Sequence, residues 1–355
     1  MRSLSTAHAD ADIAAFEEFF RSFLTAHAND NPLHQQIEHH FALAGKRLRP
    51  RLLLAAAQSF GVDAQTCFPA CTAIELLHNY SLIHDDIEDG DKMRHGRPAL
   101  WSAYGMAHGI NAGDAVGALA QLALAPLAGS LGSQSACAMS GELARANLEM
   151  CEGQALDLAS AGSPDAGMDA GMHARADAGI KAGAGINPGA WIDAYLQMIG
   201  AKTGALFGCA AAFGARCGKA DAADLQRCAR IGRLYGLGFQ IQDDIDGIWR
   251  LPEHTGKPAS DIARRKATYP IAWAKERGGA DVARLIDTAY RQAGGALSAQ
   301  SVERIREALD ASGARQAAQS AADTYFEAAL QLADDMRPLC SYIGAWRPDT
   351  LASGG

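Results

Sequence analysis

Apolar side chains recur every three or four residues along most of the chain, a spacing that predicts amphipathic helices rather than strands. Over residues 12–60 the pattern predicts two helices, with Pro50 in the first turn of the second, where proline is well tolerated. A long helix then runs from Phe68 and ends at Gly90. Further helices are expected at 109–129, 134–159, 191–216, 222–250, 260–277, 281–293, 301–311 and 314–336.

One segment, residues 160–189, lacks this pattern. It reads SAGSPDAGMDAGMHARADAGIKAGAGINPG and combines Gly, Ala and Asp with almost no bulky apolar side chain. Such a composition cannot bury enough surface to offset the entropy of ordering the chain. We expect a mobile loop inserted into a single domain that spans residues 1–355, with a short Ala-rich helix as the alternative.

The composition also favours a helical protein. Ala, Leu, Gln, Glu and Arg are frequent, whereas β-branched residues are sparse and aromatic residues make up 7% of the chain. We therefore predict an all-α fold with almost no sheet. The net charge of -8 argues against a nucleic-acid partner, because phosphate recognition needs a basic surface. The 8 cysteines show no metal-ligand spacing and are expected to be reduced core residues.

The chain gives no sign of secretion or of membrane insertion. Its N-terminal stretch, MRSLSTAHADADIAAFEEFF, mixes acidic residues into what would have to be an apolar signal core. No apolar run approaches the roughly 18–20 residues needed to cross a bilayer, and ALAQLALAPLA is too short and contains Pro126. We expect a cytoplasmic protein without stable membrane insertion.

An acidic cluster closes the long helix, in the stretch LIHDDIEDGD. With about 100° of rotation per residue, Asp85, Asp86 and Asp89 share one arc about 100° wide. Like charges repel and desolvated carboxylates are costly, so a positive partner is expected beside them. Glu88 points to one side of this arc and Asp91 lies beyond the helix, and we interpret both as solvated charges.

A second acidic cluster lies in the apolar stretch LGFQIQDDIDGIW. Asp243 and Asp244 repeat the first two acidic positions, whereas Gly247 takes the third. Asp246 projects about 60° outside the arc. Carboxylates without His or Cys partners suit Mg2+, which binds through one or two carboxylates plus phosphate oxygens. Two such clusters favour a diphosphate held through several bridging ions over two solvated helix ends.

Basic residues would complete such an anion site, although each one alone is more often a surface charge. The stretch GKRLRP is basic, and a charged loop, DKMRHGRPALW, follows the first acidic cluster. His78 lies on the same face of the long helix as Asp85, about 20° away around the axis. The basic candidates are Lys46, Arg47, Arg49, Arg94, Arg97, Lys202, Lys257 and Lys266.

These stretches resemble the motifs of the trans-isoprenyl diphosphate synthases, also called polyprenyl synthetases. The likeness runs in the family's order through GKRLRP, ELLHNYSLIHDDIEDGD, EGQALDL, MIGAKTGALF, FQIQDDIDGIW, GKPASDI and RRKATYP. The resemblance implies an isoprenoid synthase fold of about ten main helices around a deep central cavity, usually as a homodimer. It also implies a Mg2+-dependent enzyme that joins isopentenyl diphosphate to dimethylallyl, geranyl or farnesyl diphosphate.

The resemblance assigns a role to each candidate residue. The implied Mg2+ ligands are Asp85, Asp86, Asp89, Asp243 and Asp244. The implied cations on the allylic diphosphate are Arg94, Lys202 and Lys257, and Thr203 is implied to position the reacting region, so that Lys202, Thr203 and Lys257 serve catalysis. The implied site for isopentenyl diphosphate consists of Lys46, Arg49 and His78, with Gln154 and Gln240 as polar lining.

Two positions depart from the family pattern. His95 stands where the family usually carries a second arginine that reaches isopentenyl diphosphate. A neutral imidazole would weaken that contact, and a protonated one would make it depend on pH. Gly247 replaces the last aspartate of the second acidic motif, a variation that the family tolerates. Activity is therefore expected, with a weaker site for isopentenyl diphosphate.

Residues just before the first acidic cluster are expected to set the length of the product. Tyr80 lies five positions before Asp85, about 7.5 Å along the helix axis, and Ser81 lies four positions before it. Similar enzymes with an aromatic residue at the first of these positions, and no insertion in the motif, often make geranylgeranyl diphosphate. We favour this product over farnesyl diphosphate. A packed core tyrosine is the alternative interpretation of Tyr80.

Two other functions are open on the same scaffold. A terpene cyclase would share the acidic motifs but needs no second diphosphate site, so GKRLRP and His78 argue against it. A noncatalytic partner subunit is expected to have lost acidic motifs, and this chain has both.

Overall fold

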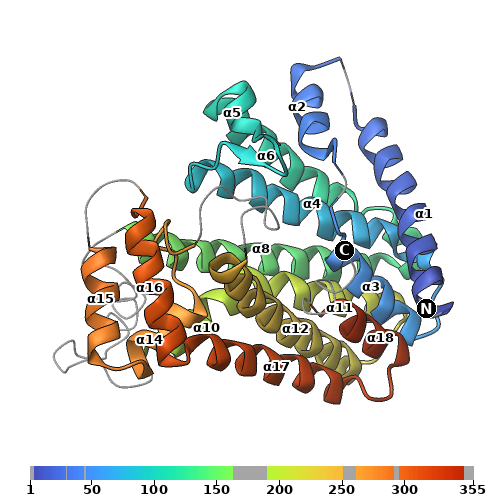
Figure 1. The fold of residues 1–355 in the computed structure, drawn as a ribbon. Coiled ribbons are helices and arrows are strands. Elements are labelled where there is room, and N and C mark those ends of the chain that lie inside the picture. Colours follow the sequence, from blue (N-terminus) through green and yellow to red (C-terminus); the bar gives the residue numbers. More distant parts are fainter. Residues whose placement is uncertain are drawn as a thin grey trace, which may run out of the picture. The chain divides into compact units, whose positions relative to one another are not determined.

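The computed structural model describes residues 4–28, 30–43, 45–162, 190–250, 261–291 and 296–347. Helices make up most of these residues (Figure 1). The strands among them are β1 (Met93–Arg94) and β2 (Arg97–Pro98), which form one short hairpin. The all-α fold class and the near absence of sheet are therefore confirmed.

The described chain divides into two compact units, and each is described by itself. The first unit comprises Met1–Asn147, Leu206–Gly232 and Leu330–Trp346. The second comprises Leu148–Ala205, Arg233–Ala329 and Arg347–Gly355. A single domain over residues 1–355 stays a prediction, as does the central cavity.

The first unit begins with α1 (Leu4–Ala26), α2 (Pro32–Phe41) and α3 (Leu48–Ser59). The prediction of two helices over residues 12–60 is therefore wrong. The helix that the apolar pattern misses is α2, which is only 10 residues long. Its start carries a clear local signal, because the Asn31 side chain accepts a hydrogen bond from Leu33 N and Pro32 occupies the first turn.

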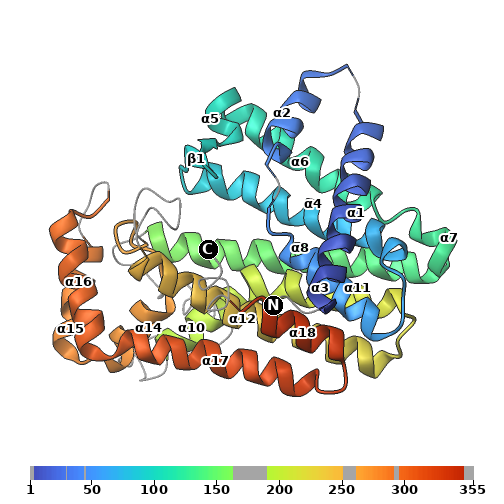
Figure 2. The same ribbon diagram turned by 45° about the vertical axis from the view of Figure 1, so that its right-hand side comes forward.

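The central helix of the first unit is α4 (Ala64–Glu88), capped at its start by Asp63, whose carboxylate accepts from Gln65 N. Its apolar face is buried, with Ile74 and Leu76 fully inaccessible. Alongside it runs α6 (Met106–Leu122), as Figures 1 and 2 both show. The predicted end at Gly90 is confirmed, since Gly90 has a φ of 68° that terminates the helix.

The charged loop after α4 contains the hairpin of β1 and β2. Met93 pairs with Pro98 and Arg94 pairs with Arg97, so His95 and Gly96 form a two-residue turn. Both turn residues have positive φ, 50° for His95 and 75° for Gly96, as a tight hairpin turn requires. This geometry fixes the direction in which β1 presents Arg94.

The remaining helices of the first unit are short or shared with the second. They are α5 (Leu100–Tyr104), α7 (Leu127–Leu131), α11 (Ala205–Cys217), α18 (Arg337–Ala345) and the first parts of α8 (Ser133–Gly162) and α12 (Ala222–Trp249). The C-terminal α18 packs on α3, where the Tyr342 hydroxyl donates to Leu48 O at 2.8 Å.

The second unit contains the rest of α8, α10 (Ala190–Ile199), the π-helical turn η1 (Gly200–Gly204) and most of α12 (Ala222–Trp249). It continues with α14 (Tyr269–Arg277), α15 (Ala280–Tyr290), α16 (Ala299–Ser312) and α17 (Ala314–Leu332). One apolar cluster joins several of these helices and includes Ile248, Ile271, Ile286, Ile305 and Leu309.

Two predicted boundaries in this unit are shifted. Residues 261–265 form turns, so the helix expected over 260–277 begins only at Tyr269. The loop predicted over 160–189 does not begin at residue 160, because α8 continues through Gly162. Residues 163–189 lie outside the described residues, so the prediction of a mobile loop there stays a prediction.

Two helical stretches among the described residues are long and apolar enough to cross a membrane by length and composition alone, Met106–Leu131 and Ala190–Cys217. The sequence-based expectation of no such run is wrong in this respect, because Ala-rich helices continue across the turn residues. In the apolar 18-residue window of Ala190–Cys217, 72% is buried within the protein, as in a core helix, whereas in that of Met106–Leu131 28% is buried. Such stretches are weak signs of a membrane protein.

Candidate active site

The first acidic cluster lies at the C-terminal end of α4. Asp86 is 3% exposed, and its carboxylate accepts from Arg94 Nε at 2.8 Å and Arg94 Nη2 at 2.7 Å. Asp85 is half-buried and Asp89 is exposed. Burial raises the pKa of Asp86 above its usual value, although Arg94 opposes this rise. The cluster is thus divided into one pinned carboxylate and two that solvent reaches.

Arg94 comes to the cluster from the hairpin. Its bidentate pairing with Asp86 gives both geometric specificity and charge neutralisation. The structure thus confirms that a cation lies beside the acidic cluster, as like-charge repulsion requires. Its predicted role on the allylic diphosphate stays a prediction.

Lys46, Arg49 and His78, predicted to bind isopentenyl diphosphate, lie in the first unit, whereas the predicted lining residues Gln154 and Gln240 belong to the second. Burial, followed by the positive charges of Arg49 and Arg94, holds the pKa of His78 well below its usual value. Burial, Arg94 and Lys46 likewise lower the pKa of His95. Arg94 thus acts on both imidazoles, and burial together with the nearby cations favours their neutral forms.

Sequence analysis missed His40 as a member of this group. Burial lowers the pKa of His40 to about 4, and Arg94, His39 and His95 add to the effect. His40 Nε2 donates to Asn79 Oδ1 at 2.9 Å. A histidine on a short helix that the apolar pattern does not reveal gives no sequence signal for this position.

The second acidic cluster lies on α12 in the second unit, and its two aspartates differ sharply. Asp243 is exposed, whereas Asp244 is 5% exposed. The Asp244 carboxylate accepts hydrogen bonds from the Tyr195 hydroxyl, from Tyr269 N at 2.8 Å and from Gln240 Nε2 at 3.3 Å. Burial raises the pKa of Asp244 to about 8, against the effect of these donors. Asp244 is therefore held as Asp86 is, beside an exposed neighbour.

The segment that carries Lys202 and Thr203 is η1. Lys202 Nζ donates to Asp157 Oδ2 at 2.6 Å, and Thr203 Oγ1 donates to Gln240 Oε1 at 2.9 Å. Gly153 on α8 makes this arrangement possible, because a Cβ at that position would overlap the backbone of Lys202. The motifs EGQALDL and MIGAKTGALF thus meet in space, and π-helical turns are frequent at functional sites.

Gly247, the position that lacks the third aspartate of the second motif, lies against Asp261. A Cβ built on Gly247 would overlap the Asp261 carboxylate, and Asp261 N donates to Gly247 O at 3.3 Å. Asp261 is 6% exposed and its charge helps to raise the pKa of Asp244. The space that a side chain at residue 247 would need is therefore occupied by another carboxylate.

The residues predicted to set product length lie on α4. The Tyr80 ring meets the His84 ring edge to face, with centroids 4.7 Å apart, and contacts α6 at Gly117. A Cβ on Gly117 would come within 3.1 Å of the Tyr80 ring. Ser81 Oγ donates to His78 O at 2.8 Å. Tyr80 is thus packed against α6, and its role as a ruler stays a prediction.

Several predicted site residues are only partly placed. Lys257 lies outside the described residues. Gln154 is half-buried on α8, one residue after Gly153. The two acidic clusters belong to different units, so the prediction that they face one another across a shared cavity stays a prediction.

The donor set fits a hard divalent cation that substrate oxygens complete. Among the residues the structure describes, no group of three or more His, Cys, Asp or Glu side chains lies close enough to hold an ion. The first cluster offers two accessible carboxylates, those of Asp85 and Asp89, and the second offers one, that of Asp243. Mg2+ typically binds through that number of carboxylates and takes its other ligands from water and substrate phosphates.

Sequence analysis did not identify Asp157, Tyr195, Asp261 and Tyr269 as partners of the site. Asp157 and Asp261 lie within motifs that carry the family resemblance, so their position was available as a signal. Tyr269 lies within RRKATYP and so had the same signal, although it reaches Asp244 through its backbone N–H. Tyr195 reaches Asp244 from far along the chain, and no spacing in the sequence indicates it.

Known proteins resemble this chain over most of its length. A geranylgeranyl diphosphate synthase of Mycobacterium tuberculosis is 36% identical over 293 residues, which cover 82% of this chain and 75% of that protein. A (2E,6E)-farnesyl diphosphate synthase of Mycobacterium bovis is 35% identical over 242 residues, 68% of this chain and 60% of that protein's own length.

Solved structures share the fold. A polyprenyl synthase from Caulobacter crescentus CB15, in complex with calcium and isoprenyl diphosphate, superimposes with a TM-score of 0.77 and 27% identity, covering 97% of this chain and 96% of that one. The sequence profile of the polyprenyl synthetase family matches residues 30–310. The chain therefore belongs to the polyprenyl synthetase family.

Proposed function

We propose that the protein is a prenyl diphosphate synthase that condenses isopentenyl diphosphate with an allylic diphosphate, dimethylallyl, geranyl or farnesyl diphosphate. The observation that carries the proposal is the division within each aspartate pair. Asp86 and Asp244 are buried and fixed by hydrogen bonds, whereas Asp85 and Asp243 keep solvent access. The relatives that make geranylgeranyl and farnesyl diphosphate support this function.

The first step is departure of the diphosphate from the allylic carbon. The predicted ligands Asp85, Asp86, Asp89, Asp243 and Asp244 would hold Mg2+, which would supply Lewis-acid chemistry to the departing oxygens. Of these five carboxylates, solvent reaches Asp85, Asp89 and Asp243. Arg94, Lys202 and Lys257 would add positive charge where negative charge develops, which lowers the barrier electrostatically. Arg94 and Lys202 would exchange their present carboxylate partners, Asp86 and Asp157, for phosphate oxygens.

The second step joins the two substrates. Lys46, Arg49 and His78 would bind isopentenyl diphosphate, with Gln154 and Gln240 as polar lining. Its double bond attacks the allylic cation, a proton passes to the departed diphosphate, and the chain is five carbons longer. Thr203, fixed by Gln240, would position the reacting region. His95 is expected to contribute little binding energy while it is neutral.

We further propose that geranylgeranyl diphosphate is the main product and that Tyr80 and Ser81 line the path of the growing tail. Farnesyl diphosphate is the second candidate product. The packing of Tyr80 against Gly117 supports a ruler with a fixed orientation, since the ring is held on two sides.

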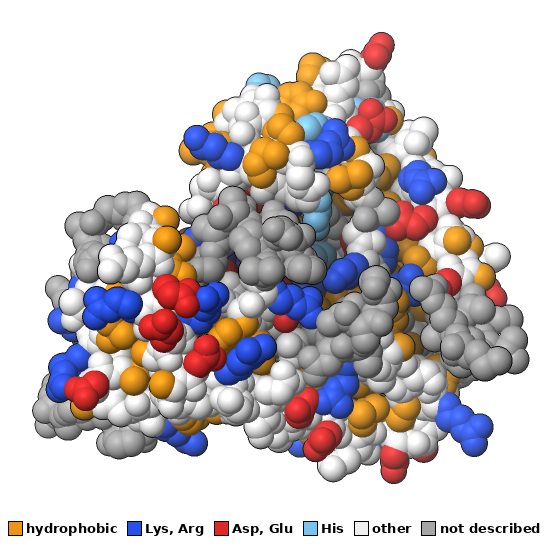
Figure 3. Space-filling view, viewed as in Figure 1, with side chains coloured by type: hydrophobic (Ala, Val, Ile, Leu, Met, Phe, Trp, Pro, Cys, Tyr) orange, Lys and Arg blue, Asp and Glu red, His pale blue; other side chains and the backbone are white. Residues whose placement is uncertain are grey.

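A homodimer in the cytoplasm completes the proposal. Support for self-association comes from α6, where Met106, Ile110 and Leu122 are 55%, 45% and 53% exposed. Met106 and Ile110 lie one turn apart and so share a face of α6, and contiguous exposed apolar patches mark interaction surfaces. Figure 3 shows basic and acidic side chains interspersed on the face it presents, a pattern that favours small substrates over nucleic acid.

The test is incubation of the purified protein with Mg2+, labelled isopentenyl diphosphate and each allylic diphosphate in turn, followed by sizing of the products. Linear products that end at one length are expected. Cyclic products would instead indicate a terpene cyclase. Absence of turnover unless a second synthase subunit is added would indicate a noncatalytic partner. Undiminished turnover after complete removal of divalent ions would refute the proposed chemistry.

A further inference from the structure

Helix α1 precedes the residues that match the family profile, which begins at residue 30. It nevertheless makes two polar contacts with the basic stretch GKRLRPRLL and a third with Gln58, farther along α3. Glu17 accepts from Arg47 at 2.5 Å, Asp10 from Arg51 at 3.0 Å and Asp12 from Gln58 at 2.7 Å. These contacts tie α1 to the turn before α3 and to α3 itself.

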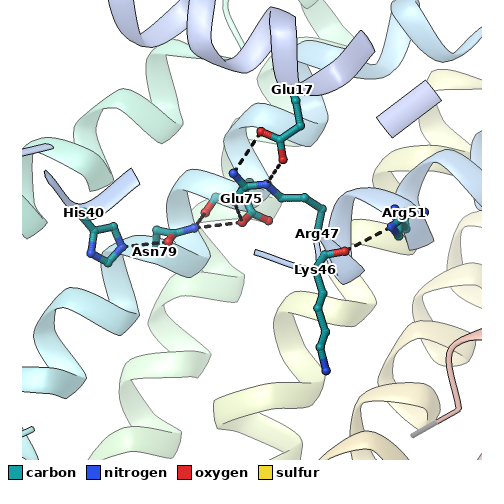
Figure 4. Close-up of polar contacts among 7 residues, drawn as sticks. All are labelled: Glu17, His40, Lys46, Arg47, Arg51, Glu75 and Asn79. Carbon is teal, nitrogen blue, oxygen red and sulfur yellow. Dashed lines mark hydrogen bonds and ion pairs between the residues drawn. The ribbon is translucent and has the colours of Figure 1, made fainter. Parts of the chain in front are cut away.

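Arg47 is the centre of this arrangement (Figure 4). Its guanidinium is buried, donating from Nε to Glu17 on α1 and from Nη1 to Glu75 on α4, each at 2.5 Å. The ring of Phe20, also on α1, lies 5.2 Å from Arg47 Cζ. The buried guanidinium is expected to keep both carboxylate partners, because moving away from either one would leave an unpaired charge in the protein interior.

The backbone of Arg47 is as constrained as its side chain. Its φ of 53° and ψ of 39° place it in the left-handed region, which is unfavourable for a residue with a Cβ, so surrounding contacts must hold it there. The two carboxylates supply such contacts. Arg47 is also the N-cap of α3, so its conformation sets the direction in which α3 begins.

The basic residues of the stretch fall into two groups. Arg47 and Arg51 are held by α1, and Arg51 Nε also donates to Lys46 O at 3.2 Å. Lys46 is exposed, and Figure 4 shows its side chain extending away from Glu17 and Glu75. Arg49 is half-buried, with its Cζ 4.3 Å from the centroid of the Phe207 ring. The Lys46 backbone is therefore fixed from both sides, by Arg47 and by Arg51, while its ammonium group faces outward.

Hydrogen bonds connect Glu75, one carboxylate partner of Arg47, to α2. Asn79 Nδ2 donates to Glu75 Oε1 at 3.1 Å and to Glu75 O at 2.8 Å, and its oxygen accepts from His40. His40 in turn lies near Arg94 and His95, whose charges lower its pKa. A chain of contacts thus runs from α1 through Arg47 and α4 to α2.

We propose that Arg47 and Glu17 are positioning residues for isopentenyl diphosphate: they hold the turn before α3 in the conformation that presents Lys46 and Arg49 to the diphosphate. Neither residue touches the substrate. The proposal rests on the proposed function in one respect, the assignment of Lys46 and Arg49 to that substrate.

The test compares Glu17→Ala with Glu18→Ala in the full chain. Glu18 is the adjacent carboxylate on α1 and is exposed, so it matches the change in charge and helix propensity. Glu17→Ala is expected to raise the KM and the Kd for isopentenyl diphosphate about tenfold, the scale of one hydrogen bond to a charged group. The KM for geranyl diphosphate should stay within about twofold, and Glu18→Ala should change neither.

Variants of Arg47 give a second and independent measure. Arg47→Met leaves Glu17 and Glu75 unpaired, so this variant is expected to unfold readily. Arg47→Lys keeps a positive charge between the two carboxylates and should keep part of the wild-type affinity for isopentenyl diphosphate. The triple variant Glu17→Gln, Arg47→Met, Glu75→Gln removes all three charges together and should fold. It should still bind isopentenyl diphosphate weakly, because the turn is no longer held.

The outcomes separate the two proposals. A wild-type protein without condensation activity would refute the proposed function. An active wild-type protein whose folded Glu17→Ala variant keeps its KM for isopentenyl diphosphate would refute only the positioning role. Equal increases in both KM values would also refute it, since they indicate general loosening. Normal affinity in the folded triple variant would have the same meaning.

Discussion

Acidification should destabilise the protein through His40. Burial, opposed by the Asn79 contact and reinforced by Arg94, lowers the pKa of His40 from 6.5 to about 4. Above pH 6.5 the imidazole is neutral in both the folded and the unfolded chain. As the pH falls below that value, the unfolded chain takes up the proton first, so stability is lost between about 6.5 and about 4. The loss amounts to at most about 3 kcal/mol, and less because the ring is partly exposed.

The measurement is the free energy of unfolding in urea for the wild type and for His40→Gln at several pH values between about 7.5 and about 4.5. Glutamine keeps a donor for Asn79 Oδ1 but does not titrate, so the variant should lose less stability on acidification. Some loss will persist because the pKa of His78 is also held low. His27→Gln is the control, since His27 is exposed. A wild-type pH profile in His40→Gln would refute the assignment.

Three further substitutions test the rest of the site. Gly247→Asp, which restores the family pattern, should lower stability by about 1–3 kcal/mol in chemical denaturation and reduce turnover, because its side chain overlaps Asp261; a stable and fully active variant would contradict this packing. Tyr195→Phe should lower the free energy of unfolding by about 1–2 kcal/mol through loss of the bond to Asp244, and an unchanged urea midpoint would show that the bond contributes nothing. Tyr80→Ala should lengthen the product as sized by chromatography, whereas unchanged lengths would reject its role as a ruler.

The helical architecture could be predicted from the sequence because its signal is periodic. The long helix that ends at Gly90 shows many turns of apolar spacing, and its acidic face followed directly from helix geometry. The short α2 shows too few turns for this signal, and its start is encoded instead in the pair Asn31 and Pro32. The hairpin escaped prediction because its turn is His95-Gly96, which is not one of the pairs, such as Asn-Gly or Asp-Gly, that mark a two-residue hairpin turn in sequence.

The site was predicted by residue type but not by partner. Asp86 and Asp244 are each the second residue of an Asp-Asp pair whose first residue is accessible to solvent. Only the fold shows that the second residue is buried. Their hydrogen-bond partners differ in chemistry: Arg94, which pairs with Asp86, comes from a hairpin, and Tyr195, which donates to Asp244, comes from a helix. Long-range pairing of this kind has no period and no fixed spacing, so local sequence rules cannot supply it.

The π-helical turn η1 changes the angle around the helix axis between the side chains that lie before and after it. Tyr195 and Thr203 are eight residues apart, which in an unbroken α-helix would turn them about 80° away from one another. One extra residue in a widened turn makes those eight residues span the rotation of about seven, so the two side chains come within about 20° of the same direction. That alignment lets them reach Asp244 and Gln240, one turn apart on α12. Deleting a single residue from Gly200–Gly204 would therefore let only one of the two contacts form.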